Sequence, residues 1–504
     1  MFLGMKDQQC GMVRGKGLGG SSIIYFMVYN RGHKVDFDRW AAAGNTGWSF
    51  DDVWPYFLKT ENSTLEDLLD SPNHNKNGLM NVEYNKGRTH LAEAFVEANK
   101  YLGQKEVDYN SGHHQLGVSF LQGNTKSGQK QSAFRAFLEP ILKRPNLHIM
   151  LNTRVSQILI EPKTKVAFGV EFIRNGRKHR VTARKEVILS SGTFHSPQLL
   201  MLSGIGMKND LARIKVPLIQ HLPVGKIILD HMMHNGPTII TNTTSLSDNI
   251  GLRGAVRAAR EYTEGSGLLT IPSGVEALSF IKTKHGMHYG DNVPDVELVF
   301  TPGSLHLDRG FGAKYAGRMS DDTYNSAYKP LENIKTDTFI ISQLIFHPKS
   351  KGYLKVVDKN IFTPPKIYPN FFSDPEDIEV LLEGLKFSLR LINTPPFQKI
   401  GARIHAAPLK NCAHIHFGSD DYWRCSLRTL TNSLAHQTST CKMGPTNDPW
   451  AVVSPELKVH GIKNLRVVDT SVIPGSITGH TNSASVMIGE KAADLIKNQW
   501  SGLN

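Results

Sequence analysis

The sequence predicts a mixed α/β protein: an α/β domain with alternating strands and helices, and a second domain that is rich in sheet. Residues 186–206 have the pattern of a strand, a turn of small residues and a helix. Residues 464–500 repeat the order strand, loop and helix. Alternation of this kind is typical of an α/β domain, whereas the intervening segment 236–451 shows mixed strand and loop patterns.

A helix is expected over 90–103, since Leu91, Phe95, Ala98 and Leu102 share one helical face and Gly103 follows as a stop. Residues 146–161 are interpreted as two short strands. The next strand is expected to turn back at Asn175-Gly176, a dipeptide typical of a tight hairpin.

Three further helices follow from their terminal residues. In 186–206, Ser196 is a plausible N-cap and Pro197 suits the first helical position. Residues 374–394 form an amphipathic pattern that opens with acidic residues, which suit the positive end of a helix. The last helix should begin near Thr481, where Asn482 could serve simply as a cap.

Composition and charge exclude several classes of protein. A content of 40% hydrophobic and 20% charged residues is that of a globular protein rather than a disordered one. No run of 18 apolar residues occurs, and the first 20 residues lack the apolar core of a signal peptide. The net charge of +13 is spread along the chain without a dense basic segment, so nucleic-acid binding is not expected.

Neither the cysteines nor the histidines form a metal-binding pattern. None of the four cysteines belongs to a C-x-x-C pair, so a zinc site is not expected. Spacing alone leaves open whether Cys412 and Cys425 form a disulfide. His405, His414 and His416 lie near one another in sequence, but no carboxylate or cysteine completes a ligand set there.

The glycine run "RGKGLGGSSIIYFMVYNRG" at 14–32 contains the spelling G-x-G-x-x-G at Gly15, Gly17 and Gly20. That spelling marks a dinucleotide-binding turn only when a buried strand precedes it and a helix follows. The preceding residues include Lys6-Asp7-Gln8-Gln9 and make a poor strand. The alternative is a glycine-rich bend that allows close backbone packing.

Two C-terminal stretches carry chemistry-bearing residues. A predicted strand ends at Asp469, and the N-terminus of the last helix should face the ligand crevice beyond that strand. Asp469 could instead satisfy amides of its own loop. His436 stands in "LAHQTSTCKMGP" among small polar residues and is a candidate for catalysis, although a lone histidine is usually structural.

In combination, these stretches resemble the glucose–methanol–choline (GMC) flavin oxidoreductases, and most of all their insect glucose-dehydrogenase-like branch. "GKGLGGSSIIYFMVYNRG" and "SGTFHSPQLLMLSGIG" resemble the two family signatures. "LPVGKIILDH" resembles the short motif that follows them. "AHQTSTCKMGP" and "NLRVVDTSVIPGSITGHTNSASVMIGEKAADLI" resemble the catalytic end. The resemblance extends from about residue 10 to residue 497.

The resemblance implies FAD as cofactor and oxidation of an alcohol or sugar CH–OH group, with hydride transfer to the flavin and a histidine base. It assigns His436 as the base and Asn482 as its neighbour that orients the substrate oxygen. The expected contacts with the cofactor are Gly17, Leu18, Gly19, Gly20, Ser21, Ser22, Tyr25, Phe26, Met27, Val28, Val155, Asp469, His480 and Thr481. The expected partners are a small alcohol or sugar and a quinone-like acceptor or oxygen.

The resemblance also implies an organisation of the chain. Residues 1–235 correspond to the N-terminal FAD-binding region, 236–451 to the substrate domain, and 340–497 to the C-terminal region with interleaved elements. In the family an ADP-binding βαβ unit precedes the glycine run, so the FAD-binding domain is expected to be incomplete at its N-terminus. The family suggests an extracellular protein, although the first 20 residues resemble no signal peptide.

Some residues depart from the family pattern. Tyr25 stands where an asparagine is usual, "HQTST" replaces the commoner "HPxGT", and Ile227 and Leu229 replace polar residues. The alternative hypothesis is therefore a non-catalytic GMC-like protein, or a truncated product, that does not hold FAD.

Overall fold

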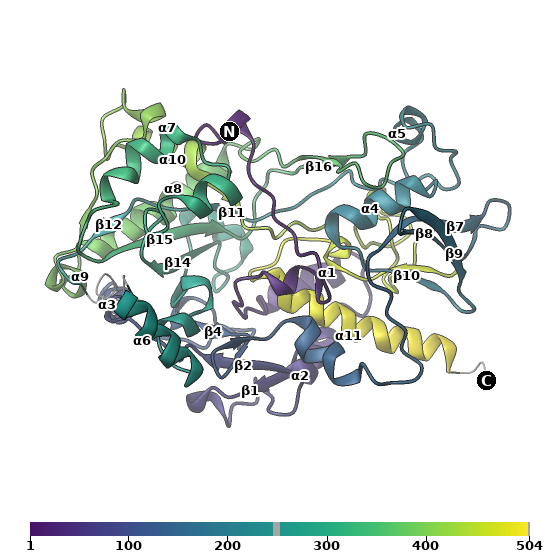
Figure 1. The fold of residues 1–504 in the computed structure, drawn as a ribbon, viewed down its shortest axis with the longest axis horizontal. Coiled ribbons are helices and arrows are strands. Elements are labelled where there is room, and N and C mark those ends of the chain that lie inside the picture. Colours follow the sequence, from purple (N-terminus) through teal and green to yellow (C-terminus); the bar gives the residue numbers. More distant parts are fainter. Residues whose placement is uncertain (245–251, 502–504) are drawn as a thin grey trace.

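The computed structural model describes residues 1–244 and 252–501. Figure 1 shows a large sheet with helices α7, α8 and α10 beside it in one half of the molecule, and strands β7–β10 with helices α4 and α5 in the other half. The longest helix, α11, lies below them in this view. The helices are α1 (Lys34–Ala42), α2 (Phe50–Thr60), α3 (His90–Tyr101), α4 (Gly192–Leu202), α5 (Lys208–Arg213), α6 (Leu252–Thr263), α7 (Asp321–Ala327), α8 (Glu376–Ile392), α9 (Pro395–Lys399), α10 (Asp420–Leu430) and α11 (Thr481–Trp500).

The large sheet is antiparallel and draws on distant parts of the chain. Its strand order is β18 (Arg403–Ile404), β12 (Ile239–Ile240), β15 (Thr338–Ile345), β14 (Val296–Pro302), β13 (Ala277–Ile281) and β3 (Gly117–Phe120). Strand β11 (Met232–His234) joins β15 to β19 (Thr431–Ser433). Strands β14 and β15 are almost wholly buried, and helices α3 and α8 pack against them.

A second sheet confirms the predicted hairpin. Strands β7 (Thr153–Glu161), β8 (Val166–Arg174) and β9 (Arg177–Thr182) form an antiparallel meander. Asn175 and Gly176 turn between β8 and β9 with φ of 50° and 73°, the left-handed values that such a turn needs. The prediction of two strands in 146–161 was wrong. Residues 146–152 have no partner strand, and Ile149, Met150 and Leu151 are exposed.

The strand–turn–helix at 186–206 is present, but its helix begins earlier than predicted. Strand β10 (Val187–Leu189) pairs in parallel with β20 (Leu465–Val467). Helix α4 has Ser191 as N-cap, so Ser196 and Pro197 lie inside it. Proline is tolerated there because the carbonyl of residue 193, which loses its helical partner, accepts from the Thr440 hydroxyl at 2.6 Å.

The remaining strands are short. They are β1 (Glu61–Ser63), β2 (Met80–Tyr84), β4 (Gln122–Gly123), β5 (Thr125–Lys126), β6 (Gln129–Lys130), β16 (Tyr353–Lys355) and β17 (Lys366–Tyr368). The helices predicted over 90–103 and 374–394 are confirmed as α3 and α8. Thr89 caps α3, and Gly103 ends it with φ of 88°.

Two large hydrophobic cores support the fold. One lies on the large sheet and includes Leu91 and Phe95 of α3. The other joins α1, α2, α4 and α11 to β7, β8, β10 and β20. Each core collects segments from both ends of the chain, so the elements of the two halves interleave in sequence. The predicted domain boundaries at residues 235, 340 and 451 stay predictions.

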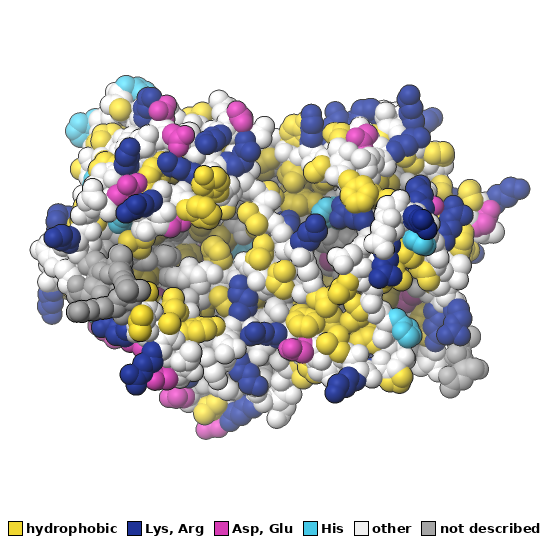
Figure 2. All heavy atoms as spheres, viewed as in Figure 1, with side chains coloured by type: hydrophobic (Ala, Val, Ile, Leu, Met, Phe, Trp, Pro, Cys, Tyr) yellow, Lys and Arg dark blue, Asp and Glu magenta, His cyan; other side chains and the backbone are white. Residues whose placement is uncertain are grey.

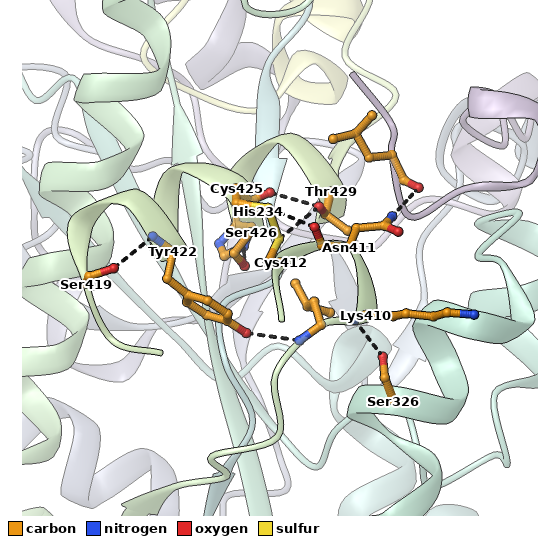
Figure 3. Close-up of a disulfide and its surroundings, with 12 residues drawn as sticks. His234, Ser326, Lys410, Asn411, Cys412, Ser419, Tyr422, Cys425, Ser426 and Thr429 are labelled. Carbon is orange, nitrogen blue, oxygen red and sulfur yellow. Dashed lines mark hydrogen bonds between the residues drawn. A yellow bond between two sulfur atoms is a disulfide. The ribbon is translucent and has the colours of Figure 1, made fainter. Parts of the chain in front are cut away.

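A disulfide joins Cys412 to Cys425 and ties the segment before α10 to that helix (Figure 3). Around it, the Thr429 hydroxyl donates to the carbonyl of Cys425 at 2.8 Å, and the Tyr422 hydroxyl accepts from the Leu409 amide at 3.1 Å. This answers the question that sequence spacing left open.

The surface carries no dominant charged stripe on the face shown in Figure 2, where lysine and arginine side chains are scattered and hydrophobic ones gather near the centre. Among the helices of the described residues, none combines the length and the apolar character needed to cross a membrane.

Candidate active site

The candidate site is centred on His436, which follows strand β19. Strand β11 pairs with β19, with Met232 opposite Ser433. This register brings His231, the residue before β11, beside His436 although 205 positions separate them in sequence. The third member of the cluster, His480, is the N-cap residue of α11.

The three imidazole rings are in contact. Nδ1 of His436 lies 3.0 Å from Nδ1 of His231. The rings of His436 and His480 meet edge to face with centroids 4.7 Å apart. On its far side, Nε2 of His480 lies 3.0 Å from the carboxylate of Glu297, a fully buried residue on β14.

The surroundings favour neutral histidines at the centre. Burial, together with nearby His480, His231 and Arg14, holds the pKa of His436 well below its ordinary value. Burial and nearby His480 lower the pKa of His231 to about 3. A neutral imidazole can accept a proton, so this environment suits a base.

Asp230 and Arg14 fix the backbone around His436. Asp230 is buried and accepts hydrogen bonds from the His436 amide at 3.2 Å, from Nε2 of Gln437 at 2.7 Å and from the Ser433 hydroxyl. Burial raises the pKa of Asp230 to about 6. Arg14 donates to the carbonyl of Ala435 at 3.2 Å and to Gln437. The loop is thus held from two sides while the His436 side chain stays partly exposed.

The loop after His436 contains a strained residue. Ser439 adopts φ of 69°, in the left-handed region that glycine tolerates best. It stands where the commoner "HPxGT" pattern has glycine. Its hydroxyl donates to the carbonyl of Ile473 at 2.7 Å, which helps to hold this conformation.

The glycine run forms a bend rather than a strand–turn–helix. Residues 9–16 contain no strand, and only a short 3-10 helix, Gly20–Ile23, follows. Gly19 and Gly20 have φ of 95° and 57°, so both positions favour glycine. Ser22 is buried and accepts from the amide of Ala133 at 2.9 Å. Gly17, Gly20, Ser21 and Phe26 are exposed, whereas Leu18 and Gly19 are half-buried.

The rest of the run connects this bend to the histidine cluster. Tyr25 turns its hydroxyl to the carbonyl of Gln131 at 2.6 Å. Met27 adopts φ of 61° and Val28 bridges to Gly123, both buried. Farther along, the carbonyl of Asn30 accepts from the hydroxyl of Ser483 in the first turn of α11 at 2.6 Å. The bend and the start of α11 are thus parts of one region.

The remaining residues predicted to contact the cofactor are Asp469, Thr481 and Val155. Asp469 accepts from the Gly192 amide at 2.9 Å, from the Ser471 amide at 2.8 Å and from the Ser196 hydroxyl. It therefore ties β20 to α4 and satisfies loop amides. Thr481 is buried at the start of α11. Val155 lies on β7 against the second core and makes no contact with the histidines.

Asn482 lies in the first turn of α11, partly exposed, and in the described part of the chain its side chain makes no hydrogen bond. It is not the N-cap, because His480 holds that position. The ring of His480 contacts that of His436, and the place of Asn482 beside His436 stays a prediction. Across residues 1–244 and 252–501, no group of three or more metal-ligating side chains is positioned to hold an ion.

Sequence reasoning missed several members of the site. Asp230 and His231 end the motif "LPVGKIILDH", which signalled the region but not their contacts. Glu297, Ser476 and Arg14 carry no local signal, because each reaches the cluster from a segment distant in sequence. Glu297 contacts His480, Ser476 contacts His231, and Arg14 donates to the carbonyl of Ala435 beside His436.

Comparison with known proteins identifies the family of this chain. Two family models, both described as GMC oxidoreductase, match residues 2–233 and 348–489. Glucose dehydrogenase (FAD, quinone) of Drosophila pseudoobscura pseudoobscura is 36% identical over 502 residues, which cover 99% of this chain and 76% of that protein. Mitochondrial choline dehydrogenase of Homo sapiens is 34% identical over 493 residues, covering 96% and 76%.

Among solved structures, a variant of formate oxidase from Aspergillus oryzae superposes with a TM-score of 0.84 at 25% identity, covering 97% of this chain and 85% of that one. Family models and relatives both extend over most of the chain. The chain therefore belongs to the GMC oxidoreductase family.

Proposed function

We propose that this protein oxidises the CH–OH group of an alcohol or sugar, with His436 as the base and His480 beside it. The observation that carries the proposal is the contact between the His436 and His480 rings at a partly exposed position. Two adjacent imidazoles can bind one hydroxyl oxygen, one accepting its proton and the other donating to the oxygen.

Membership of the family and the names of its relatives make FAD the cofactor. The residues present fit it. Gly20 and Gly192 adopt positive φ with no atom within 4 Å of where a Cβ would lie, so the backbone offers an open cradle at both places. The first turn of α11 has no side-chain cap, which leaves amides free for a polar group of the cofactor.

The groups proposed to hold FAD are the bend Gly17–Ser22, residues 25–28, the α11 turn at His480 and Thr481, and Val155 and Asp469. Asp469 would act by fixing the loop between β20 and α4. When bound, FAD supplies the acceptor for the hydride that leaves the carbinol carbon.

Residues of this chain accept the hydroxyl proton and hold the substrate oxygen. His436 accepts the hydroxyl proton as the C–H bond breaks, and the alcohol becomes a carbonyl compound. His480 holds the oxygen and is itself held by Glu297. Asn482, two residues after His480, is proposed to contact the substrate oxygen or its neighbours. The two electrons then leave to a quinone-like acceptor or to oxygen, as the names of the relatives suggest.

A panel of primary alcohols, sugars and choline, assayed with FAD and a quinone dye, tests this proposal. His436→Ala should keep its flavin absorbance and lose about 10²–10⁴-fold in kcat/KM, the usual contribution of a general base. Turnover of no alcohol by the unsubstituted flavoprotein would favour the non-catalytic alternative. Turnover that is unchanged in His436→Ala would remove this histidine from the mechanism.

A further inference from the structure

A chain of hydrogen bonds connects His436 to a backbone carbonyl in the large sheet. Nδ1 of His436 lies 3.0 Å from Nδ1 of His231. Nε2 of His231 lies 3.3 Å from the hydroxyl oxygen of Ser476. The Ser476 hydroxyl in turn donates to the carbonyl of Phe346, just after β15, at 2.6 Å. These three hydrogen bonds join four residues from four separate segments of the chain.

The direction of every bond in this chain follows from its last link. A carbonyl oxygen can only accept, so the single hydroxyl proton of Ser476 is committed to Phe346. The Ser476 oxygen must then accept from Nε2–H of His231. A neutral His231 with its proton on Nε2 has a lone pair on Nδ1, which can only accept from Nδ1–H of His436. His436 is left with its own lone pair on Nε2.

We infer that His231, anchored by Ser476, is a positioning residue that fixes His436 in the tautomer with its proton on Nδ1 and its lone pair on Nε2. This inference rests on the proposed function, in which His436 accepts the proton of the substrate hydroxyl. The partner on the other ring nitrogen decides which histidine nitrogen is free to react.

The surroundings of His231 support this role. His231 is buried, and the ring of Phe346 packs against it edge to face at 5.7 Å. Burial and nearby His480 lower its pKa to about 3, so the ring stays neutral at physiological pH. A protonated His231 would carry hydrogen on both nitrogens and could not accept from His436. Burial thus keeps the direction of the chain fixed.

Three substitutions distinguish a positioning role of His231 from a contribution to folding. His231→Leu removes the acceptor that faces His436, whereas His231→Asn retains an oxygen near the place of Nδ1. Ser476→Ala removes the anchor and leaves His231 in place. The matched control is His234→Asn, because His234 is another buried histidine, on β11, and bonds to Gln343 and Ser426 instead of His436.

Nitrogen NMR of ¹⁵N-histidine-labelled full-length protein reads the tautomer directly, with His436→Ala identifying the resonances. We expect Nδ1 of His436 to be protonated in the unsubstituted protein, in His231→Asn and in His234→Asn. In His231→Leu and Ser476→Ala the proton should divide between both nitrogens. The kcat/KM of His231→Leu should fall about 10–100-fold, the usual loss when the partner that orients a functional histidine is removed, and His231→Asn should recover most of it.

The result that overturns the inference is an unprotonated Nδ1 on His436, or a His231→Leu variant that keeps both tautomer and kcat/KM. The tautomer reading does not depend on the proposed function. If Nδ1 is protonated as expected but no alcohol is oxidised, the positioning role of His231 stands and the proposed function fails.

Discussion

Nε2 of His480 lies 3.0 Å from the carboxylate of Glu297. The ring of His480 also contacts the ring of His436 edge to face. Glu297 is on β14 in the large sheet, and His480 is the N-cap of α11. A fully buried carboxylate is costly unless it is paired. The pair therefore joins the two halves of the molecule at the proposed reaction site and gives His480 a fixed orientation.

Glu297→Gln should lower kcat/KM by about 10–100-fold, because a hydrogen bond to a charged group is worth about 1.5–3 kcal/mol. The titratable groups near the pair are His436, His231 and Tyr109.

Steady-state kinetics from pH 4 to 9 check this prediction, with Glu276→Gln as the matched control. Glu276 is an equally buried carboxylate just before β13 that bonds to Thr89 instead of a histidine. Its variant should keep the parent profile. Equal losses in both variants would show that Glu297 acts only through stability.

The pH dependence of the parent enzyme follows from the environment of His436. Burial, together with nearby His480, His231 and Arg14, holds its pKa well below the ordinary value of about 6.5. A base must be unprotonated, so kcat/KM should rise with pH through a single ionisation that lies below pH 6.5, and should be level from about pH 6.5 to 8. A midpoint at or above 6.5 in the pH profile of kcat/KM would contradict this expectation.

Ser439 offers a test of backbone strain. At a φ of 69°, a residue with a Cβ costs about 1–2 kcal/mol more than glycine. Ser439→Gly should therefore be more stable than Ser439→Ala by about this amount, the reverse of the usual effect of glycine. Both variants lose the hydrogen bond to Ile473, so their difference isolates the backbone. Urea unfolding at neutral pH measures it.

The sequence predicted the fold where local patterns suffice. The helices at 90–103 and 374–394 have clear apolar faces and end signals, and Asn175-Gly176 forces a hairpin. Local patterns placed the start of α4 wrongly, at Ser196 and Pro197. The helix begins earlier, because the turn at Gly192 and the distant Asp469 set its first residue. No local rule shows that a tertiary hydroxyl will satisfy the carbonyl that Pro197 frees.

For the site, the sequence indicated stretches rather than contacts. His436, His480 and the glycine bend lie in recognisable stretches, and their roles in catalysis and cofactor binding stay predictions. The partners of the histidines lie far away in sequence, since Glu297 is 183 positions from His480 and Ser476 is 245 positions from His231. Single-sequence patterns contain no information on such distant contacts, and the place of Asn482 beside His436 stays a prediction.

The disulfide should contribute measurably to stability. Cys412 and Cys425 are 13 positions apart, and closing a loop of about 15 residues restricts the unfolded chain by about 3 kcal/mol. Replacing both cysteines with serine should lower the free energy of unfolding by about that amount. A reducing agent should destabilise the parent protein similarly and leave the double variant unchanged. An equal effect of the reducing agent on both proteins would show that the loss of stability comes from groups other than this disulfide.

His74 gives the protein a predictable loss of stability at alkaline pH. Its ring is almost fully buried between Glu61, at 2.8 Å, and Asp108, at 3.1 Å. Burial alone would lower the pKa of His74, but hydrogen bonds to Asp108 and Glu61 outweigh it and raise the pKa to about 9. Glu61 is also paired with Arg31, which is fully buried. The protonated ring thus completes a buried network of alternating charges.

The sign of the effect follows from proton linkage. The folded pKa of about 9 exceeds the unfolded value of about 6.5, so the stabilisation is complete below pH 6.5 and is lost as pH rises toward 9. Over this window the free energy of unfolding should fall by up to about 1.4 kcal/mol per pH unit relative to His74→Gln. Urea unfolding at half-unit pH steps measures the difference, and His148→Gln, at an exposed histidine, should follow the parent curve. Parallel curves for the parent and His74→Gln between pH 6.5 and 9 would show that His74 is neutral in the folded protein.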